Sequence, residues 1–393
     1  MQPTQSLSLA YLAYFAVLGV FVPYIGIFLD HRGLNSQQIG TLLAIVTAMR
    51  IVGPNLWSLL AARRGDPVGV MRLGAVLAAL GWCSTFIDAG YSLLLLGLVL
   101  YSLCWTAILP QLESAAFFYL NNDTGRYSKV RSAGSVGYIL LVVGSGMALE
   151  QLGPGFLPGG ALLFLLLMLL ALWQLPAFSL KAAPAEIAIK FRTLWVHRPF
   201  VLFMLAAFLL QLSFAPFYGF FTLYCRDLGY SGTASGLLIA LAVAAEIVAF
   251  YYAGKILGQR SYSVLLGLCY LLTALRWAVV GWFGQEPWIL AASMLLHAFS
   301  FAVAHSCAMQ FIQQFFPPAQ RGRGQALYAG LIYGGGGALG AYIAGWTWQD
   351  GAGSQLSFSW AAVACLVAFA LVQGLPRVIR PIGVSDAVTQ PKI

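Results

Sequence analysis

The chain consists of long apolar runs separated by short polar stretches. A helix needs about 20 apolar residues to cross a bilayer, and most of the runs reach that length with few charges. Twelve runs can be placed, at 7–29, 37–62, 70–87, 91–119, 129–150, 158–177, 199–224, 232–256, 262–284, 287–315, 325–348 and 356–375. This pattern predicts an all-α polytopic membrane protein with twelve transmembrane helices.

The longest polar connection divides the runs into two groups of six. It extends over 178–198 and contains Pro184 and several basic residues, whereas the other connections are too short for an additional domain. We therefore expect an N-terminal six-helix bundle at 1–177, a cytoplasmic linker at 178–198, and a C-terminal six-helix bundle with a short cytoplasmic tail at 199–393.

Segments of the first half recur in the second half. Arg50-Ile51-Val52 returns as Glu246-Ile247-Val248, and 23–28 (PYIGIF) returns at nearly the same offset as 216–221 (PFYGFF). Parallel repeats in transporters are related by an axis along the membrane normal. Such an axis would place Arg50 and Glu246 at matching depths. We expect these two charges to neutralise one another across the centre of the molecule, directly or through water.

Composition and charge agree with a multi-pass membrane protein. Hydrophobic residues make up 60% of the 393 residues and charged residues only 8%, whereas about a quarter of the residues of soluble domains are charged. Most basic residues fall on one side of the predicted spans, with Arg32 and Arg226 on the other side. The positive-inside rule then places both termini in the cytoplasm. The net charge of +9 comes from scattered loop residues, so we expect contact with a lipid bilayer and no nucleic-acid partner.

Charges within the spans favour transport over catalysis. Intramembrane ionisable residues are rare and are usually functional, and Arg50, Glu246 and Arg276 stand on different helices. An enzyme would need a convergent nucleophile, base or metal cluster, but the two intramembrane histidines, His297 and His305, share one helix without a carboxylate nearby in sequence. The six dispersed cysteines lack metal-ligand spacing. We expect a secondary transporter that is not an enzyme, with no cofactor and no metal.

Three segments resemble the 3-phenylpropionate permease family of the major facilitator superfamily: 50–54 (RIVGP), 245–248 (AEIV) and 320–328 (QRGRGQALY). The resemblance covers essentially the whole chain and implies the major facilitator fold, with two pseudo-symmetric bundles. It implies a proton-coupled symporter that imports a small organic substrate by alternating access, with an aromatic carboxylate such as 3-phenylpropionate as the substrate. We expect a monomer in a bacterial inner membrane.

The chain is more distantly similar to lactose permease, and this similarity points to individual positions. The residues that match its functional side chains are Glu113, Arg131, Tyr138, Glu246, Arg276 and His297. Ser300 stands where lactose permease has its proton-carrying glutamate, so the similarity does not identify the proton carrier here. The match at the first three positions favours an alternative function, the symport of a neutral sugar or nucleoside.

These patterns define two groups of candidate residues. The substrate-binding candidates are Arg50, Glu113, Arg131, Tyr138, Tyr24 and Phe217. The proton-coupling candidates are Glu246, Arg276, His297 and His305. A planar guanidinium such as that of Arg50 suits bidentate carboxylate binding, and the three aromatic candidates would stack on a ring. A gate salt bridge between Glu113 and Arg131 is the alternative to substrate contact. Arg276 is expected to orient His297 or Glu246, and His305 is expected to be a packing residue.

Overall fold

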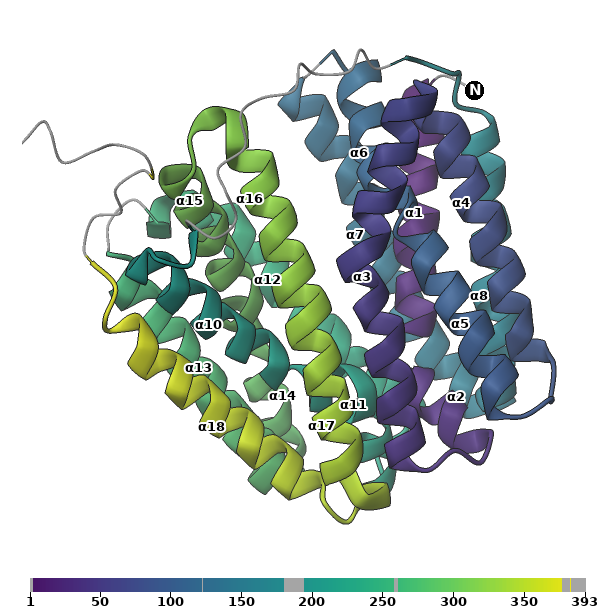
Figure 1. Cartoon of the computed structure of the whole chain (residues 1–393). Helices are drawn as coiled ribbons and strands as arrows, with labels where there is room; N and C mark the ends of the chain where they lie inside the picture. Colours follow the sequence, from purple (N-terminus) through teal and green to yellow (C-terminus); the bar gives the residue numbers. More distant parts are fainter. Residues whose placement is uncertain (1–2, 122, 180–193, 258–260, 377–381, 383–393) are drawn as a thin grey trace, which may run out of the picture.

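The computed structural model describes residues 3–121, 123–179, 194–257, 261–376 and 382. Two helical bundles stand beside one another (Figure 1). The N-terminal bundle contains α1 (Pro3–Phe21), α2 (Ile25–His31), α3 (Ser36–Arg64), α4 (Pro67–Trp82), α5 (Tyr91–Trp105), α6 (Ile108–Tyr119), α7 (Thr124–Leu152) and α8 (Leu157–Trp173). The C-terminal bundle contains α10 (Arg198–Ser213), α11 (Ala215–Asp227), α12 (Gly232–Leu257), α13 (Tyr262–Phe283), α14 (Pro287–Leu295), α15 (Ala304–Phe315), α16 (Arg321–Tyr328), α17 (Gly337–Trp348) and α18 (Ser354–Val372).

Short non-α segments connect these helices. Two of them are π-helical, η3 (Ala298–Val303) and η5 (Ala329–Gly336), and both lie in the C-terminal bundle. The 3-10 turns are η1 (Cys83–Phe86), η2 (Pro154–Phe156), η4 (Pro318–Gln320) and η6 (Gln349–Gly351). Single π-helical turns occur often at functional sites, which directs attention to η3 and η5.

The predicted spans lie on helices, but several of these helices are interrupted within a span. Within the described residues, 11 helical stretches are long and apolar enough to cross a membrane. The predicted run at 325–348 is also helical, but α16, η5 and α17 form it together, so the π-helical segment interrupts the regular helix. Of the predicted linker and tail, 180–193, 377–381 and 383–393 lie outside the described residues.

The sequence repeat appears as a matching break in each half. Pro23 lies in the turn between α1 and α2, and Pro216 lies in the first turn of α11, directly after α10. Proline cannot donate a backbone hydrogen bond and therefore interrupts a continuing helix. The segments that follow the two breaks meet, because a Cβ on Gly26 would overlap the backbone of Gly219. The glycine pair lets α2 and α11 approach backbone to backbone.

The two bundles join at one end and diverge toward the other, as Figure 1 shows. Helices α1 and α7 begin at one end of the molecule, and α3 ends there with Arg63 and Arg64. We call this end the basic end. Hydrogen bonds and ion pairs between the bundles lie at the opposite end. They join Asp30 Oδ2 to Arg226 Nη1 at 2.5 Å, Ser36 N to Asp350 Oδ1 at 2.7 Å, Thr233 Oγ1 to Glu150 Oε2 at 2.7 Å, and Thr222 Oγ1 to Pro23 O at 2.6 Å.

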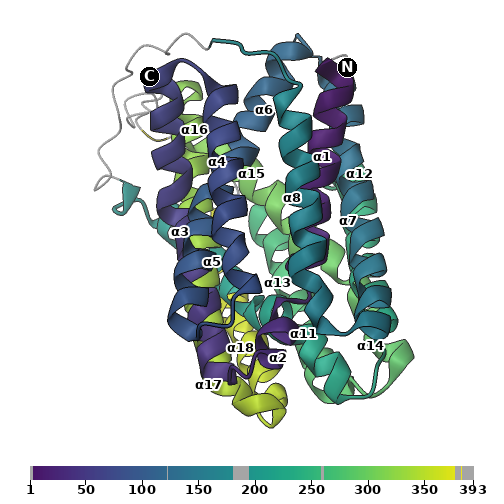
Figure 2. The same cartoon turned by 90° about the vertical axis from the view of Figure 1, so that its right-hand side faces the viewer.

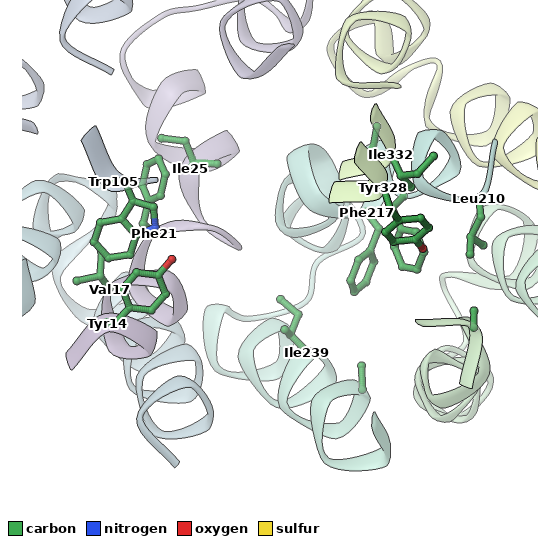
Figure 3. Close-up of a cluster of buried hydrophobic side chains, with 14 of the residues drawn as sticks. Tyr14, Val17, Phe21, Ile25, Trp105, Leu210, Phe217, Ile239, Tyr328 and Ile332 are labelled. Carbon is green, nitrogen blue, oxygen red and sulfur yellow. The ribbon is translucent and has the colours of Figure 1, made fainter. Parts of the chain in front are cut away.

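Apolar side chains pack within each bundle and also continue across the contact between the bundles. In the N-terminal bundle α1 packs against both α7 and α8 (Figure 2), and in the C-terminal bundle α13 packs along α18. Figure 3 shows buried side chains of the N-terminal bundle, including Tyr14, Phe21 and Trp105, as a group separate from Leu210 and Tyr328 of the C-terminal bundle. The halves can therefore keep their internal packing if they move relative to one another.

Candidate substrate cavity between the two bundles

Two adjoining cavities lie between the bundles. The large cavity has a volume of about 720 Å³, and the small cavity has a volume of about 320 Å³. Val22, Tyr218 and Phe301 line both, so the cavities meet at these side chains. The large cavity reaches toward the basic end, because Tyr127 and Ser128 in the first turn of α7 form part of its wall.

Arg50 is the charged residue of the small cavity. It comes from the middle of α3, and its guanidinium forms no hydrogen bond or ion pair with a described residue. Much of the surrounding wall is apolar and includes Phe21, Ile25, Leu43 and Val46. A guanidinium has five donors and no acceptor, so this cavity offers unused donors beside apolar surface.

Glu246, His297 and Arg276 form a chain of contacts beside the large cavity. Arg276 Nη1 lies 2.9 Å from His297 Nδ1, and His297 Nε2 lies 3.4 Å from Glu246 Oε2. A guanidinium can only donate, so His297 Nδ1 must accept. The imidazole proton is therefore assigned to Nε2, which faces Glu246.

Arg276 is fully buried and does not line either cavity. Its guanidinium lies 4.5 Å from the ring centroids of both Phe217 and Trp277, and such cation–π contacts stabilise a cation that has lost water. Arg276 forms no ion pair with a carboxylate among the described residues. This contact places Arg276 where it could orient His297, and the orienting role stays a prediction.

The expected direct pairing of Arg50 with Glu246 is wrong for this conformation. Arg50 lines the small cavity, whereas Glu246 lines the large cavity and contacts His297. The repeat predicted equivalent positions in the two halves, but the side chains leave their helices toward different parts of the central space. Each charge therefore has its own surroundings.

Glu113 and Arg131 pair within the N-terminal bundle. Arg131 Nε lies 3.5 Å from Glu113 Oε1, and Tyr127 donates a hydrogen bond to Glu113 Oε2. The Arg131 guanidinium lies 4.2 Å from the Phe15 ring centroid. This ion pair joins α6 to α7, so it does not close a gate between the two bundles. Arg131 lines the large cavity, where it is accessible to a ligand.

The aromatic candidates separate into cavity and packing residues. Tyr138 and Phe217 line the large cavity. Tyr24 does not line it, because its side chain is fully buried and its hydroxyl donates to Val142 O at 2.6 Å. The interpretation of Tyr24 as a stacking residue is therefore wrong. Its hydrogen bond instead connects the turn between α1 and α2 to α7.

His305 forms one hydrogen bond and packs against an aromatic ring. Its Nδ1 lies 2.8 Å from the Tyr333 hydroxyl, and its ring stacks on Phe301 with the centroids 5.8 Å apart. It lines neither the large nor the small cavity. His305 lies at the start of α15, directly after η3, and forms no ion pair with Glu246 among the described residues.

Sequence reasoning missed Tyr218, Phe301 and Gln211. The first two lie where the cavities meet, and Gln211 lines the small cavity. Tyr218 belongs to the segment at 216–221 that repeats 23–28, so the repeat marked this region. The helix break at Phe214 prevents the sequence from showing which ring of the segment faces the centre. Phe301 lies inside the π-helical η3, where the usual helical periodicity does not hold.

The long apolar helices, the charges within them and the cavity between two bundles together define a membrane transporter. The chain belongs to the MFS_1 like family, whose model matches residues 4–360. It is a transporter of the major facilitator type and not an enzyme.

Curated relatives and solved structures agree with this assignment. The chain is 27% identical over 358 residues to the probable 3-phenylpropionic acid transporter of Escherichia coli (strain K12), covering 89% of this chain and 92% of that protein. It is 26% identical to the maltose permease of Geobacillus stearothermophilus, with 85% and 84% covered. The nucleoside transporter NupG has a TM-score of 0.83 at 15% identity, covering 95% of this chain and 98% of that one. The inward open xylose transporter XylE of E. coli has a TM-score of 0.69 at 15% identity, with 95% and 96% covered.

Proposed function

We propose that this protein is a proton-coupled symporter that imports an aromatic carboxylate such as 3-phenylpropionate by alternating access. The observation that carries the proposal is Arg50, a guanidinium without a partner among the described residues, in a small cavity with largely apolar walls. A carboxylate can accept two parallel hydrogen bonds from a guanidinium, and the apolar wall suits a ring. The similarity to the probable 3-phenylpropionic acid transporter of E. coli supports the same substrate class.

Glu246 is the proposed proton carrier. Its carboxyl group lines the large cavity, and its side chain is 19% exposed. His297 is less suited, because a second proton would need Nδ1, which already accepts from Arg276. Arg276 and His297 therefore act as positioning residues that hold one N–H toward Glu246. A proton on Glu246 compensates the negative charge that a substrate brings to Arg50.

The closed end and the open end support a direction of transport. If the basic end faces the cytoplasm, as the positive-inside rule predicts, the large cavity opens inward. The bundle contacts around Asp30 and Arg226 then close the outer side. In this conformation substrate and proton would leave toward the cytoplasm, and rocking of the bundles would return the empty site outward.

A binding experiment with purified protein tests the proposal. A ligand that binds the native state raises its apparent melting temperature. We expect 3-phenylpropionate to stabilise the wild type, its neutral analogue 3-phenyl-1-propanol to stabilise it much less, and Arg50→Gln to remove the difference. Equal stabilisation of wild type and Arg50→Gln by 3-phenylpropionate would contradict carboxylate binding at Arg50.

The second candidate function is the symport of a neutral sugar or nucleoside. It is favoured by the polar side chains of the large cavity, among them Arg131, Tyr127 and Tyr138, and by the similarity to the maltose permease and to NupG. The same melting experiment separates the two candidates. Stabilisation by maltose or uridine, and none by aromatic acids, would favour this second function.

A further inference from the structure

Gln211 is a buried polar residue that lines the small cavity together with Arg50. It lies on α10 of the C-terminal bundle, only 8% of the residue is exposed, and its side-chain amide forms no hydrogen bond with a described residue. Neither polar atom of this amide is sealed inside the protein, so the amide can contact a group in the cavity. The amide nitrogen lies near Gly337, which lines the same cavity. Gln211 thus has a polar group available where a substrate would sit.

We propose that Gln211 is a second binding residue for the substrate carboxylate, which is then held from both bundles at once. The inference rests on the proposed carboxylate transport. Arg50 on α3 donates from the N-terminal bundle, and Gln211 Nε2 on α10 donates from the C-terminal bundle. An ionised carboxylate has about four lone-pair positions, so it can accept from both groups together.

This arrangement determines which ligands the small cavity takes. A carboxylate offers two charged oxygens, so its hydrogen bonds to both donors are charge-assisted and stronger. An alcohol or a primary amide is neutral and offers one acceptor oxygen to both donors. The side chains of Phe21, Ile25 and Leu43 suit an apolar ring. Three residues with hydroxyl groups line the same cavity, Thr47, Tyr218 and Tyr333. The substrate class is therefore an aromatic monocarboxylate, and the wall does not exclude a hydroxyl on its ring.

The arrangement also links binding to the movement of the bundles. Because the two donors belong to different bundles, a bound carboxylate favours the conformation in which α3 and α10 stand at the right separation. Loss of Gln211 should therefore lower the maximal transport rate in addition to the affinity. A residue that only packs against the ring would change the affinity alone.

The test compares Gln211→Leu with Gln111→Leu in proteoliposomes and in direct binding of 3-phenylpropionate. Gln111, on α6, is also a buried glutamine, but it lines neither cavity. Hydrogen bonds to charged groups contribute about 1.5–3 kcal/mol. We expect Gln211→Leu to raise the Kd for 3-phenylpropionate about tenfold or more and to lower the maximal rate, while Gln111→Leu stays within about twofold of wild type.

A third variant guards against misfolding of Gln211→Leu. Gln211→Glu keeps the size of the side chain and places an internal anion in the same cavity as Arg50, so it should compete with the substrate and abolish binding at neutral pH. Wild-type affinity and rate in Gln211→Leu, together with loss of binding in Arg50→Gln, would overturn the role of Gln211 and leave carboxylate transport intact. If wild type itself does not bind 3-phenylpropionate, both the inference and the proposed function are wrong.

Discussion

Individual arginines within the membrane differ in what surrounds them, and this difference separates their roles. Arg276 is fully buried between two aromatic rings and its Nη1 donates to His297, so this donor serves the protein and no ligand reaches it. Arg50 faces a cavity and donates to no described residue, so its donors are available to a ligand. Sequence alone shows two intramembrane arginines and cannot show this difference.

Replacement of a single side chain, Glu246→Gln, should uncouple substrate transport from proton transport. Glutamine keeps the size and the contact with His297 but cannot exchange a proton. We expect uphill accumulation of substrate in right-side-out vesicles to fall to the external concentration, while exchange of labelled for unlabelled substrate continues. Full accumulation by the variant would show that another group carries the proton.

Tyr24→Phe should separate a packing role from a binding role. The change removes the hydrogen bond from the Tyr24 hydroxyl to Val142 O and leaves a buried carbonyl with one partner fewer. We expect a loss of about 1 kcal/mol in the free energy of unfolding and no change in substrate affinity. A tenfold weaker affinity with unchanged stability would restore Tyr24 as a binding residue.

Among the elements, the helices were predictable, whereas their local breaks were not. Apolar length predicted the spans, and the repeat predicted matching halves. The π-helical η3 packs against α12 and α13, whereas η5 packs against α10 and also against α3 of the N-terminal bundle. Apolar periodicity did not indicate either segment in advance. These segments turn Phe301 and Tyr333 toward the cavities, which is why the candidate residues named on that part of the chain were incomplete.

The close contact of α3 with α17 gives a prediction for these elements. A Cβ on Gly345 would overlap the backbone of Gly40, so Gly345→Val should force the two helices apart. We expect the variant to favour conformations in which the bundles separate at the end opposite the basic end. Longer distances between spin labels on α2 and α11 would report this separation. Gly144→Val is the control, because nothing lies within 4 Å of a Cβ at Gly144. Unchanged distances in Gly345→Val would show that this contact does not hold the end closed.

For the whole molecule, the fold and the class of function followed from the sequence, but the pairing of charges did not. Equivalent positions in a repeat share a depth in the membrane, yet Arg50 and Glu246 line different cavities. Substrate would therefore bind in the small cavity and the proton beside the large cavity. The two cavities adjoin at Tyr218 and Phe301. This separation makes the two binding events independently removable by mutation.

Cooperative binding of the carboxylate and the proton is tested most directly by the affinity for 3-phenylpropionate from acidic to alkaline pH. The affinity is compared in wild type, Arg50→Gln and Glu246→Gln. If anion and proton bind cooperatively, linkage requires lower pH to tighten substrate binding, by at most about tenfold per pH unit for one proton. We predict this dependence in wild type, loss of binding in Arg50→Gln, and binding without the pH dependence in Glu246→Gln. A pH-independent affinity in wild type, or a wild-type profile in Glu246→Gln, would contradict the account.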